Sequence, residues 1–504
     1  SGVNAAKAGA GFAKNLRQAL FYKVQELSFS NIDKFSTSSL VIRLTTDVTN
    51  VQMAFTMMIR MLVRAPIMLV FATFMTVKIS PKLSLIFFAV IPVLAVALIF
   101  VMTRAMPKFK RMFKKYDVVN RVVQENLIGM RVVKAFVREE HEKDKFHNSS
   151  DELAKQGAMA SGLIVTVMPV MMLLFNAVIV FTYYKGALSA NEGVMQVGQI
   201  SVFASYVVQI LMNLVMISMM LLQLARGKAC GERVVEVLDT KIDIVNPENP
   251  FVPTEPKGEV EFRNVNFKYD PESKGDNILE NVSFKAKAGQ IIGIVGGTGC
   301  GKSSLVNLIP RLYDVTGGSV LIDGVDVREY DLKALREMIG VVLQKNVLFS
   351  GTIEENIRWG KKDATHEEIV AACKASQADA FVNEQPDGYN TYLSQGGLNL
   401  SGGQKQRLCI ARAMIKKPKI LILDDSTSAV DTATEAKIRE SFYSDLKDTT
   451  VFIIAQRISS VKDADEILVV DDGEIKGIGN HEELMKTNEI YQEIYNTQQK
   501  GVLE

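Results

Sequence analysis

The chain has 504 residues, a net charge of +2 and a composition that is 48% hydrophobic. Its length allows two or more domains, and its near-neutral charge implies no nucleic-acid partner. The mean hydropathy of +0.12 is high for a soluble protein and favours membrane-embedded segments. The four cysteines and four histidines lack metal-like spacing, which disfavours a metal cluster and a disulfide framework.

Four apolar segments in the N-terminal half are long enough to cross about 30 Å of hydrocarbon as helices. They cover residues 53–77, 83–102, 162–184 and 199–224. Arg60 and Arg64 interrupt the first segment, and arginine is costly inside a bilayer. Either they lie near the membrane boundary, with the helix starting at Ala65, or they face a cavity. We expect residues 1–238 to form an all-α transmembrane domain.

The charges that flank these segments predict their orientation. Lys and Arg outnumber Asp and Glu in residues 1–52 and 103–160, which the positive-inside rule assigns to the cytoplasm. The short turns between the other segments then lie outside. Residues 103–160 are too many for a turn, and their composition favours two helices that extend beyond the bilayer.

A domain boundary follows the last apolar segment. Residues 239–256 contain a polar, proline-rich run that is typical of a linker. From residue 257 onward, short β runs are followed by alternating strands and helices. Residues 257–504 are therefore predicted to form an α/β domain, with a helical subdomain around residues 345–415.

Residues 296–304 read Gly-Gly-Thr-Gly-Cys-Gly-Lys-Ser-Ser and fit the phosphate-loop pattern G-x-x-x-x-G-K-[ST]. A predicted strand, Ile291–Val295, precedes them and a predicted helix follows. Backbone N–H groups and the helix N-terminus suit a phosphate group. Lys302 can reach the β- and γ-phosphates, and Ser303 can ligate Mg²⁺. The nucleotide-binding residues predicted here are Gly296, Gly297, Thr298, Gly299, Cys300, Gly301, Lys302, Ser303 and Ser304.

Two further motifs extend the site. The apolar run at residues 420–423 reads as a buried strand and ends in Asp424 and Asp425; Asp424 is placed to hold Mg²⁺, as a Walker B aspartate does. Residues 400–407 read Leu-Ser-Gly-Gly-Gln-Lys-Gln-Arg. They resemble the signature of ABC ATPases, and the resemblance covers about residues 257–495.

The resemblance assigns further residues to the site. Tyr269 resembles the aromatic residue that stacks on adenine, Gln344 the Q-loop glutamine, and Asp431 the D-loop aspartate. It implies that Ser303, Gln344 and Asp424 hold Mg²⁺, and that each ATP site is shared between two ABC subunits. The signature residues that it assigns to nucleotide binding are Ser401, Gly402, Gly403 and Gln404.

Three positions depart from the family pattern. Asp425 stands where the family has the glutamate that polarises the attacking water, Gln456 replaces the H-loop histidine, and Gln395 replaces a glutamate common before the signature. Aspartate is one methylene shorter, and a displacement of about 1 Å can cost about 10²-fold in rate. A neutral amide cannot carry positive charge. We predict that Asp425, Gln456 and Gln344 form a slow catalytic half; the alternative is neutral drift, with Asp425 still working.

The chain as a whole resembles one subunit of a heterodimeric bacterial ABC exporter, a class often called multidrug exporters. The resemblance implies a multi-pass protein of the cell membrane, with a cytoplasmic ATPase domain that uses ATP and Mg²⁺ to drive efflux of an unidentified substrate across the lipid bilayer. The partner subunit is expected to carry the catalytic glutamate and the H-loop histidine. Exporter halves have six transmembrane helices, so the four found here predict an N-terminally truncated chain. Residues 36–52 and 125–139 resemble the two coupling regions.

Other classes of function stay open. An ATP-gated regulator or channel of the ABC family would not pump, and transport against a gradient by reconstituted vesicles discriminates it from an exporter. The four apolar segments argue against a soluble ABC ATPase. An importer is disfavoured because importers usually keep the ATPase on a separate chain.

Overall fold

The computed structural model describes residues 2–62, 64–193, 195–270, 275–425 and 432–503. They form two compact units. The first contains the chain up to Lys23 and Ser38–Asp239, and the second contains Val24–Thr37 and the chain from Thr240 onward. A short segment from the N-terminal part of the sequence therefore packs with the C-terminal unit.

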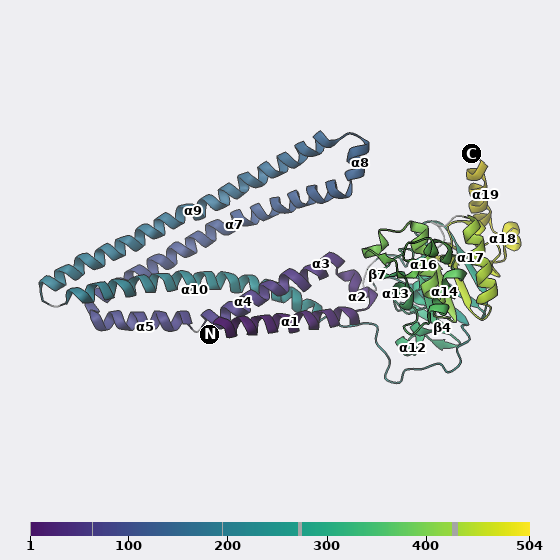
Figure 1. Ribbon diagram of the computed structural model, residues 1–504, viewed down its shortest axis with the longest axis horizontal. Coiled ribbons are helices and arrows are strands. Elements are labelled where there is room, and N and C mark those ends of the chain that lie inside the picture. Colours follow the sequence, from purple (N-terminus) through teal and green to yellow (C-terminus); the bar gives the residue numbers. More distant parts are fainter. Residues whose placement is uncertain (1, 63, 194, 271–274, 426–431, 504) are drawn as a thin grey trace. The chain divides into compact units, whose positions relative to one another are not determined.

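The first unit is helical throughout the residues that the structure describes. Its elements are α1 (Gly2–Glu26), α3 (Thr37–Ile42), the π-helix η1 (Arg43–Asp47), α4 (Val48–Met61), α5 (Arg64–Ile79), α6 (Pro81–Ser84), α7 (Ile86–Ile128), α8 (Met130–Ala135), α9 (Glu139–Asn191) and α10 (Val197–Leu238). The long helices α7 and α9 run side by side, and the short helix α8 joins them at one end (Figure 1). Residues 103–160 thus lie in a helical hairpin.

Two stretches of the described chain are long and apolar enough to cross a membrane, Thr37–Ile79 and Val197–Ile217. The predicted span 83–102 covers the end of α6 and the first part of α7, and the predicted span 162–184 lies inside α9. Many side chains of these spans are outside the description. These two spans stay predictions.

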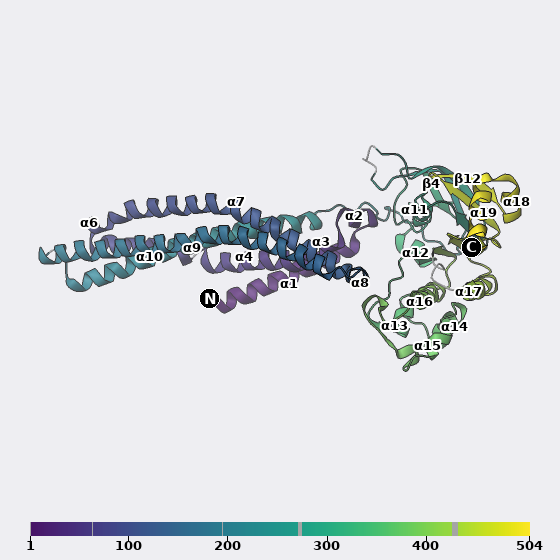
Figure 2. The same ribbon diagram turned by 90° about the horizontal axis from the view of Figure 1, so that it is seen from above.

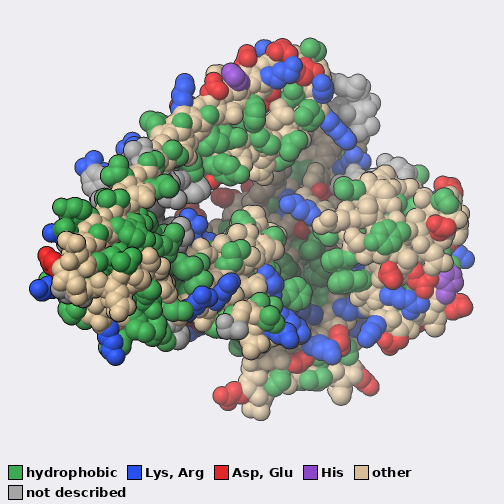
Figure 3. Space-filling model, turned by 60° about the vertical axis from the view of Figure 1, so that its left-hand side comes forward, with side chains coloured by type: hydrophobic (Ala, Val, Ile, Leu, Met, Phe, Trp, Pro, Cys, Tyr) green, Lys and Arg blue, Asp and Glu red, His purple; other side chains and the backbone are tan. Residues whose placement is uncertain are grey.

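Large apolar side chains are exposed on the helices of the first unit, as lipid contact requires. Examples on α5 and α9 are Val70, Phe74, Leu173 and Val180. Figure 3 shows hydrophobic side chains gathered over this part of the molecule.

Helix α10 packs against α4, α5 and α9 within this unit. At Gly227 the backbones approach closely, since an added Cβ would lie 2.3 Å from the Cβ of Ala54. Farther along α10, Arg233 donates to Asp47 from Nε at 2.8 Å and from Nη2 at 2.5 Å. The Asp47 side chain is only 1% exposed. This bidentate ion pair ties the end of η1 to α10.

The second unit is built on sheets. Its strands are β1 (Val260–Phe267), β2 (Leu279–Ala286), β3 (Ile291–Val295), β4 (Gly317–Ile322), β5 (Val325–Asp326), β6 (Ile339–Val342), β7 (Gly351–Thr352), β8 (Tyr392–Leu393), β9 (Ile420–Asp424), β10 (Thr450–Ile454), β11 (Glu466–Asp471) and β12 (Glu474–Gly479). The main sheet has the order β12-β11-β3-β10-β9-β6 and is parallel except for β12. An antiparallel sheet, β2-β1-β4-β5, packs beside it. The fully buried β3, β9 and β10 are the near-continuous apolar runs that a covered parallel sheet requires.

The helices of this unit are α2 (Phe29–Lys34), α11 (Lys302–Leu308), α12 (Leu332–Glu337), α13 (Ile353–Arg358), α14 (His366–Ala375), α15 (Asp379–Asn383), α16 (Gly402–Met414), α17 (Thr432–Asp445), α18 (His481–Thr487) and α19 (Glu489–Leu503), with short 3-10 turns at Gly388–Asn390, Gln395–Gly397 and Ile458–Ser460. Figure 2 shows α13 to α16 grouped to one side of the sheets. They form a helical subdomain around residues 353–414.

The stretch predicted as a linker lies along the second unit. Its Phe251 donates from N to the Glu329 carbonyl at 2.8 Å and accepts from Asp331 N at 2.9 Å. The ring of Phe251 meets the buried ring of Tyr330 edge-on at 5.1 Å. Residues 240–256 are therefore held by backbone and aromatic contacts.

Candidate nucleotide site

The predicted phosphate loop connects β3 to α11. Gly296 has a φ of 153°, and an added Cβ would lie 2.0 Å from the carbonyl oxygen of Val470 on β11. Gly301 has a φ of 97° and caps α11. Any side chain at Gly296 would push the loop off β11, so glycine there fixes the loop against the sheet.

Lys302 extends over its own loop. Its Nζ donates to the carbonyl oxygens of Gly296 at 2.9 Å and Gly297 at 2.5 Å, and lies 3.6 Å from the buried Sγ of Cys300. An ammonium group held by neutral carbonyls can exchange them for an anionic phosphate, which is the stronger partner. Thr298 and Gly299 complete the turn between these residues and α11.

Ser303 and Asp424 meet beside the loop. The Ser303 hydroxyl donates to Asp424 Oδ1 at 2.9 Å. Asp424 is the last residue of β9 and is 6% exposed; burial raises the pKa of its carboxyl group, and the hydrogen bond from Ser303 opposes that rise. Paired hydroxyl and carboxylate oxygens are hard ligands that suit Mg²⁺, which usually needs only one or two protein groups when phosphates supply the rest.

Asp425, the next residue, connects three segments. Gln456, just after β10, donates from Nε2 to Asp425 Oδ2 at 2.6 Å. Gln344, just after β6, also hydrogen-bonds the Asp425 carboxylate. Burial raises the pKa of Asp425, and both amides oppose the rise. The structure thus brings together the three residues predicted to form the catalytic half.

The backbone of Asp425 is also unusual. Its φ is 48°, in the left-handed region that aspartate tolerates better than longer side chains do. Its N donates to the Ile454 carbonyl at 3.1 Å, and its carbonyl accepts from Nε2 of the buried Gln406 at 3.4 Å. Sequence reasoning missed Gln406, although its place shortly after the signature is a usable signal.

Tyr269 stands at the edge of the loop. Its hydroxyl hydrogen-bonds the Ser304 hydroxyl at 2.9 Å, and its side chain is 41% exposed. A partly exposed ring beside the first turn of α11 can stack on a flat base.

The signature residues begin helix α16. Ser401 is the N-cap: Gln404 N donates to Ser401 Oγ at 3.3 Å, and Ser401 N donates to Gln404 Oε1 at 2.9 Å. Ser401 and Gly402 are exposed, whereas most later residues of α16 are buried. Within the described residues, no hydrogen bond joins Ser401–Gln404 to the phosphate loop. The helix start is thus exposed at Ser401 and Gly402 and partly exposed at Gly403.

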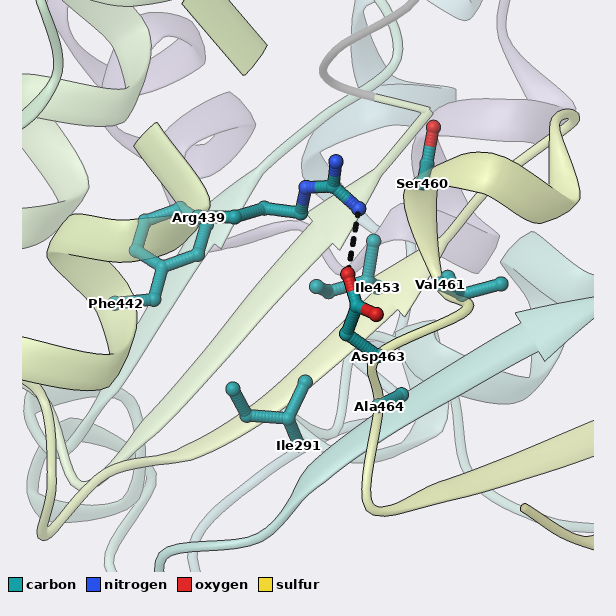
Figure 4. A pocket seen from close by; sticks show the side chains of 8 residues that line it. All are labelled: Ile291, Arg439, Phe442, Ile453, Ser460, Val461, Asp463 and Ala464. Carbon is teal, nitrogen blue, oxygen red and sulfur yellow. Dashed lines mark ion pairs between the residues drawn. The ribbon is translucent and has the colours of Figure 1, made fainter. Parts of the chain in front are cut away.

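The predicted D-loop residue, Asp431, lies outside the described residues. The helix that follows it, α17, is anchored near Gln456. Arg439 donates from Nη1 to the Ser459 carbonyl at 2.7 Å and pairs with Asp463 at 3.8 Å. Figure 4 shows this pair at a cavity of about 10 Å³, which has room for about one water molecule.

Known families and structures match this chain closely. Residues 3–214 match the family described as ABC transporter transmembrane region, and residues 279–428 match the family described as ABC transporter. The uncharacterized ABC transporter ATP-binding protein YfiB of Bacillus subtilis is 40% identical over 494 residues, covering 98% of this chain and 85% of that protein. The chain belongs to the ABC transporter family.

Two further likenesses refine this result. A fatty acid ABC transporter ATP-binding/permease protein of Mycobacterium tuberculosis is 38% identical over 476 residues, covering 94% of this chain and 75% of that protein. A bacterial Atm1-family ABC exporter, solved with ATP bound, is 26% identical with a TM-score of 0.83, covering 98% of this chain and 86% of that chain.

The predicted fold class is confirmed: a helical transmembrane domain precedes a P-loop ABC ATPase domain. The predicted location is confirmed too, since the protein is a membrane ABC exporter whose ATP-binding domain lies in the cytoplasm. The ATP-binding domain is that of an ATP-hydrolysing transporter.

Proposed function

We propose that this ABC exporter works as one half of a heterodimer with two unequal ATP sites. The site built on its own phosphate loop binds ATP and cleaves it slowly. Its signature completes a faster site on the phosphate loop of a second ABC subunit. ATP binding stabilises the closed pair of ATPase domains, and hydrolysis at the fast site removes that stabilisation to drive efflux.

The observation that carries this proposal is the state of the Asp425 carboxylate. One of its oxygens accepts a hydrogen bond from Gln456 at 2.6 Å, and Gln344 hydrogen-bonds the same group. A general base must lie within hydrogen-bond reach of the water that it activates. A short side chain tied to two amides is poorly disposed to make that contact.

Basicity does not account for slow cleavage at this site. Burial raises the pKa of Asp425, and a raised pKa makes a carboxylate a better base. Reach and orientation are the limits, because a misplacement of about 1 Å can cost about 10²-fold. Gln456 adds a second limit, since its amide cannot carry the positive charge that a histidine can bring to the γ-phosphate.

Nucleotide binding, in contrast, uses groups that are all present. Lys302 supplies a cation, Ser303 and Asp424 supply oxygens for Mg²⁺, and Tyr269 supplies a ring for the base. Bound Mg²⁺ would neutralise phosphate charge in this site. The protein's own contribution is to hold the phosphates against Lys302 and the loop backbone.

A partner subunit is supported by two exposed features. The signature helix begins at Ser401 and Gly402, which are exposed. Around α8, the apolar side chains Leu127, Ile128 and Phe136 are 67%, 78% and 73% exposed. This end of the hairpin lies in the second region that resembles a coupling segment, and we propose that it contacts an ATPase domain.

The test compares the full chain alone with the chain paired with a second ABC subunit that has the catalytic glutamate and histidine. Both samples are reconstituted in vesicles, and phosphate release and uptake of a candidate substrate are measured. We expect slow turnover by the chain alone, and fast turnover with transport against a gradient by the pair. Robust turnover by the chain alone, abolished by Asp425→Asn, contradicts the proposal. ATP-dependent flux that only follows the gradient favours a channel.

A further inference from the structure

The short helix α2 sits on the ATPase unit through contacts far apart in sequence. Its N-cap, Ser28, accepts from Asn31 N at 3.2 Å. The hydroxyls of Ser28 and Ser30 both donate to the carboxylate of Asp243. Burial disfavours the charge on Asp243, but these bonds and backbone N–H groups hold its pKa below the usual value. The N-terminal end of α2 is thus hydrogen-bonded to the Asp243 carboxylate of the same unit.

The other side of α2 meets Tyr313. The hydroxyl of Tyr313 donates to Asp33 Oδ2 at 2.7 Å, and its ring lies 6.1 Å from the ring of Phe29. Burial and the neighbouring Asp33 raise the pKa of the Tyr313 hydroxyl, so it stays a proton donor at physiological pH.

Tyr313 also touches the nucleotide site. Its ring meets the ring of Tyr269 edge-on, at 4.9 Å and 81°. The Tyr269 hydroxyl bonds Ser304 in the first turn after the phosphate loop. Phe267 packs edge-on against both tyrosines, at 4.9 Å and 5.7 Å. The contacts from Ser304 to Asp33 form one continuous path through two tyrosine rings.

We propose that Tyr313 is a positioning residue that links the base-stacking Tyr269 to the contacts of α2 with the ATPase unit, so that ATP binding changes how α2 is held there. This inference rests on the proposed role of Tyr269 in nucleotide binding. A base that stacks on Tyr269 restrains the angle of that ring. An edge-on pair keeps its favourable geometry only over a limited range of angles, so Tyr313 follows and carries its hydroxyl toward or away from Asp33.

The contact between Tyr313 and Asp33 can be tested cleanly because it is a single hydrogen bond from the Tyr313 hydroxyl. Tyr313→Phe removes that hydroxyl and keeps the ring against Tyr269 and Phe29. A purely structural role for Tyr313 would depend on the ring, whereas the proposed link depends on the oxygen. The chain offers a matched control in Tyr389, whose hydroxyl donates to Asp379 at 2.6 Å in the helical subdomain.

The experiment places an environment-sensitive fluorophore on α2. All four native cysteines are buried, so Lys34→Cys, at the exposed end of α2, gives one accessible thiol. The labelled full chain is held in lipid nanodiscs and titrated with MgATP. Binding of ATP is measured directly, and the fluorescence of the label is followed in parallel.

We expect the label to respond over the concentration range in which ATP binds. Tyr313→Phe should reduce the amplitude of this response about fivefold or more, while the Kd for ATP changes by no more than about that factor. Asp33→Asn, which keeps an acceptor oxygen, should reduce the response less. Tyr389→Phe should leave both measurements unchanged.

The outcomes separate two kinds of failure. If the unsubstituted chain does not bind MgATP, the proposed function of the site is wrong. If ATP binds and the label stays silent, or responds equally in Tyr313→Phe, the link through Tyr313 is overturned while the site stands. Should Tyr313→Phe fail to fold, Asp33→Ala decides because it removes the acceptor of the Tyr313 hydroxyl, and an unchanged response in that variant also overturns the link.

Discussion

On the proposed function, restoring the family's two missing side chains should convert a slow site into a fast one. The perturbation is the double substitution Asp425→Glu with Gln456→His. The glutamate extends the carboxylate by one methylene, and the histidine removes the amide that now donates to Asp425 at 2.6 Å. We expect the rate of hydrolysis at this site to rise about 100-fold, the factor associated with a misplacement of about 1 Å. That factor lowers the barrier by about 2.7 kcal/mol.

The single substitutions should not add up to this gain. Asp425→Glu alone leaves Gln456 and Gln344 positioned to hold the new carboxylate, so we expect about tenfold. It also places a longer side chain at a φ of 48°, at a cost of about 1 kcal/mol. Gln456→His alone leaves the short carboxylate in place and should change the rate little. Residues in direct contact commonly show such non-additive effects.

The assay must isolate this site from that of the partner subunit. The chain is paired with a second ABC subunit whose phosphate-loop lysine is replaced, and single-turnover phosphate release is measured after confirming ATP binding. A double variant that binds ATP normally but hydrolyses it no faster would refute the argument that the Asp425 side chain is too short to reach the attacking water. So would a 100-fold loss in Asp425→Asn, because that result would show that Asp425 already works as the base.

Three further outcomes follow from the geometry. Gly296→Ala should abolish ATP binding, because the added Cβ would lie 2.0 Å from the carbonyl oxygen of Val470. Gly297→Ala should fold and retain the loop, because the added Cβ would have no described atom within 4 Å. Titration with ATP distinguishes the two variants. Ser401→Ala should lower stability by about 1 kcal/mol through loss of the helix cap and stop hydrolysis at the partner's site, while ATP binding to this chain persists. Arg233→Ala should cost about 2–3 kcal/mol in thermal unfolding, below the range for a fully buried pair because Arg233 is 50% exposed.

Local sequence patterns were enough to predict the buried strands and the phosphate loop. Ile291–Val295 and residues 420–423 are continuous apolar runs, and they form fully buried parallel strands. The loop between β3 and α11 could be predicted because only glycine suits the position of Gly296. The meeting of Ser303 with Asp424 was expected from the family resemblance. It occurs because the parallel strands β3 and β9, with β10 between them, end at one edge of the sheet.

The contacts of α2 with the ATPase unit could not be predicted in this way. The segment 28–34 is short and mostly polar, and it lacks the periodicity that marks an amphipathic helix. Their partners, Asp243 and Tyr313, are more than 200 residues away, and no spacing rule reaches that far. The sequence pointed to residues 36–52 as the first coupling region, and it gave no signal for the contacts that Ser28, Phe29, Ser30 and Asp33 make with Asp243 and Tyr313.

On the proposed function, the same geometry accounts for a site that keeps nucleotide binding and loses fast cleavage. Binding depends on backbone: Gly296 holds the loop against β11, and Asp424 is buried at the end of a central strand, so changes there disturb the fold. Cleavage depends on side chains at the margin, because Gln456 and Gln344 are exposed and Asp425 is only partly buried. Substitutions at exposed positions away from special features usually change stability by less than about 0.5 kcal/mol. Gln456 can therefore depart from the family pattern at little cost to folding, and in the proposed heterodimer a partner subunit that cleaves ATP would remove the functional cost as well.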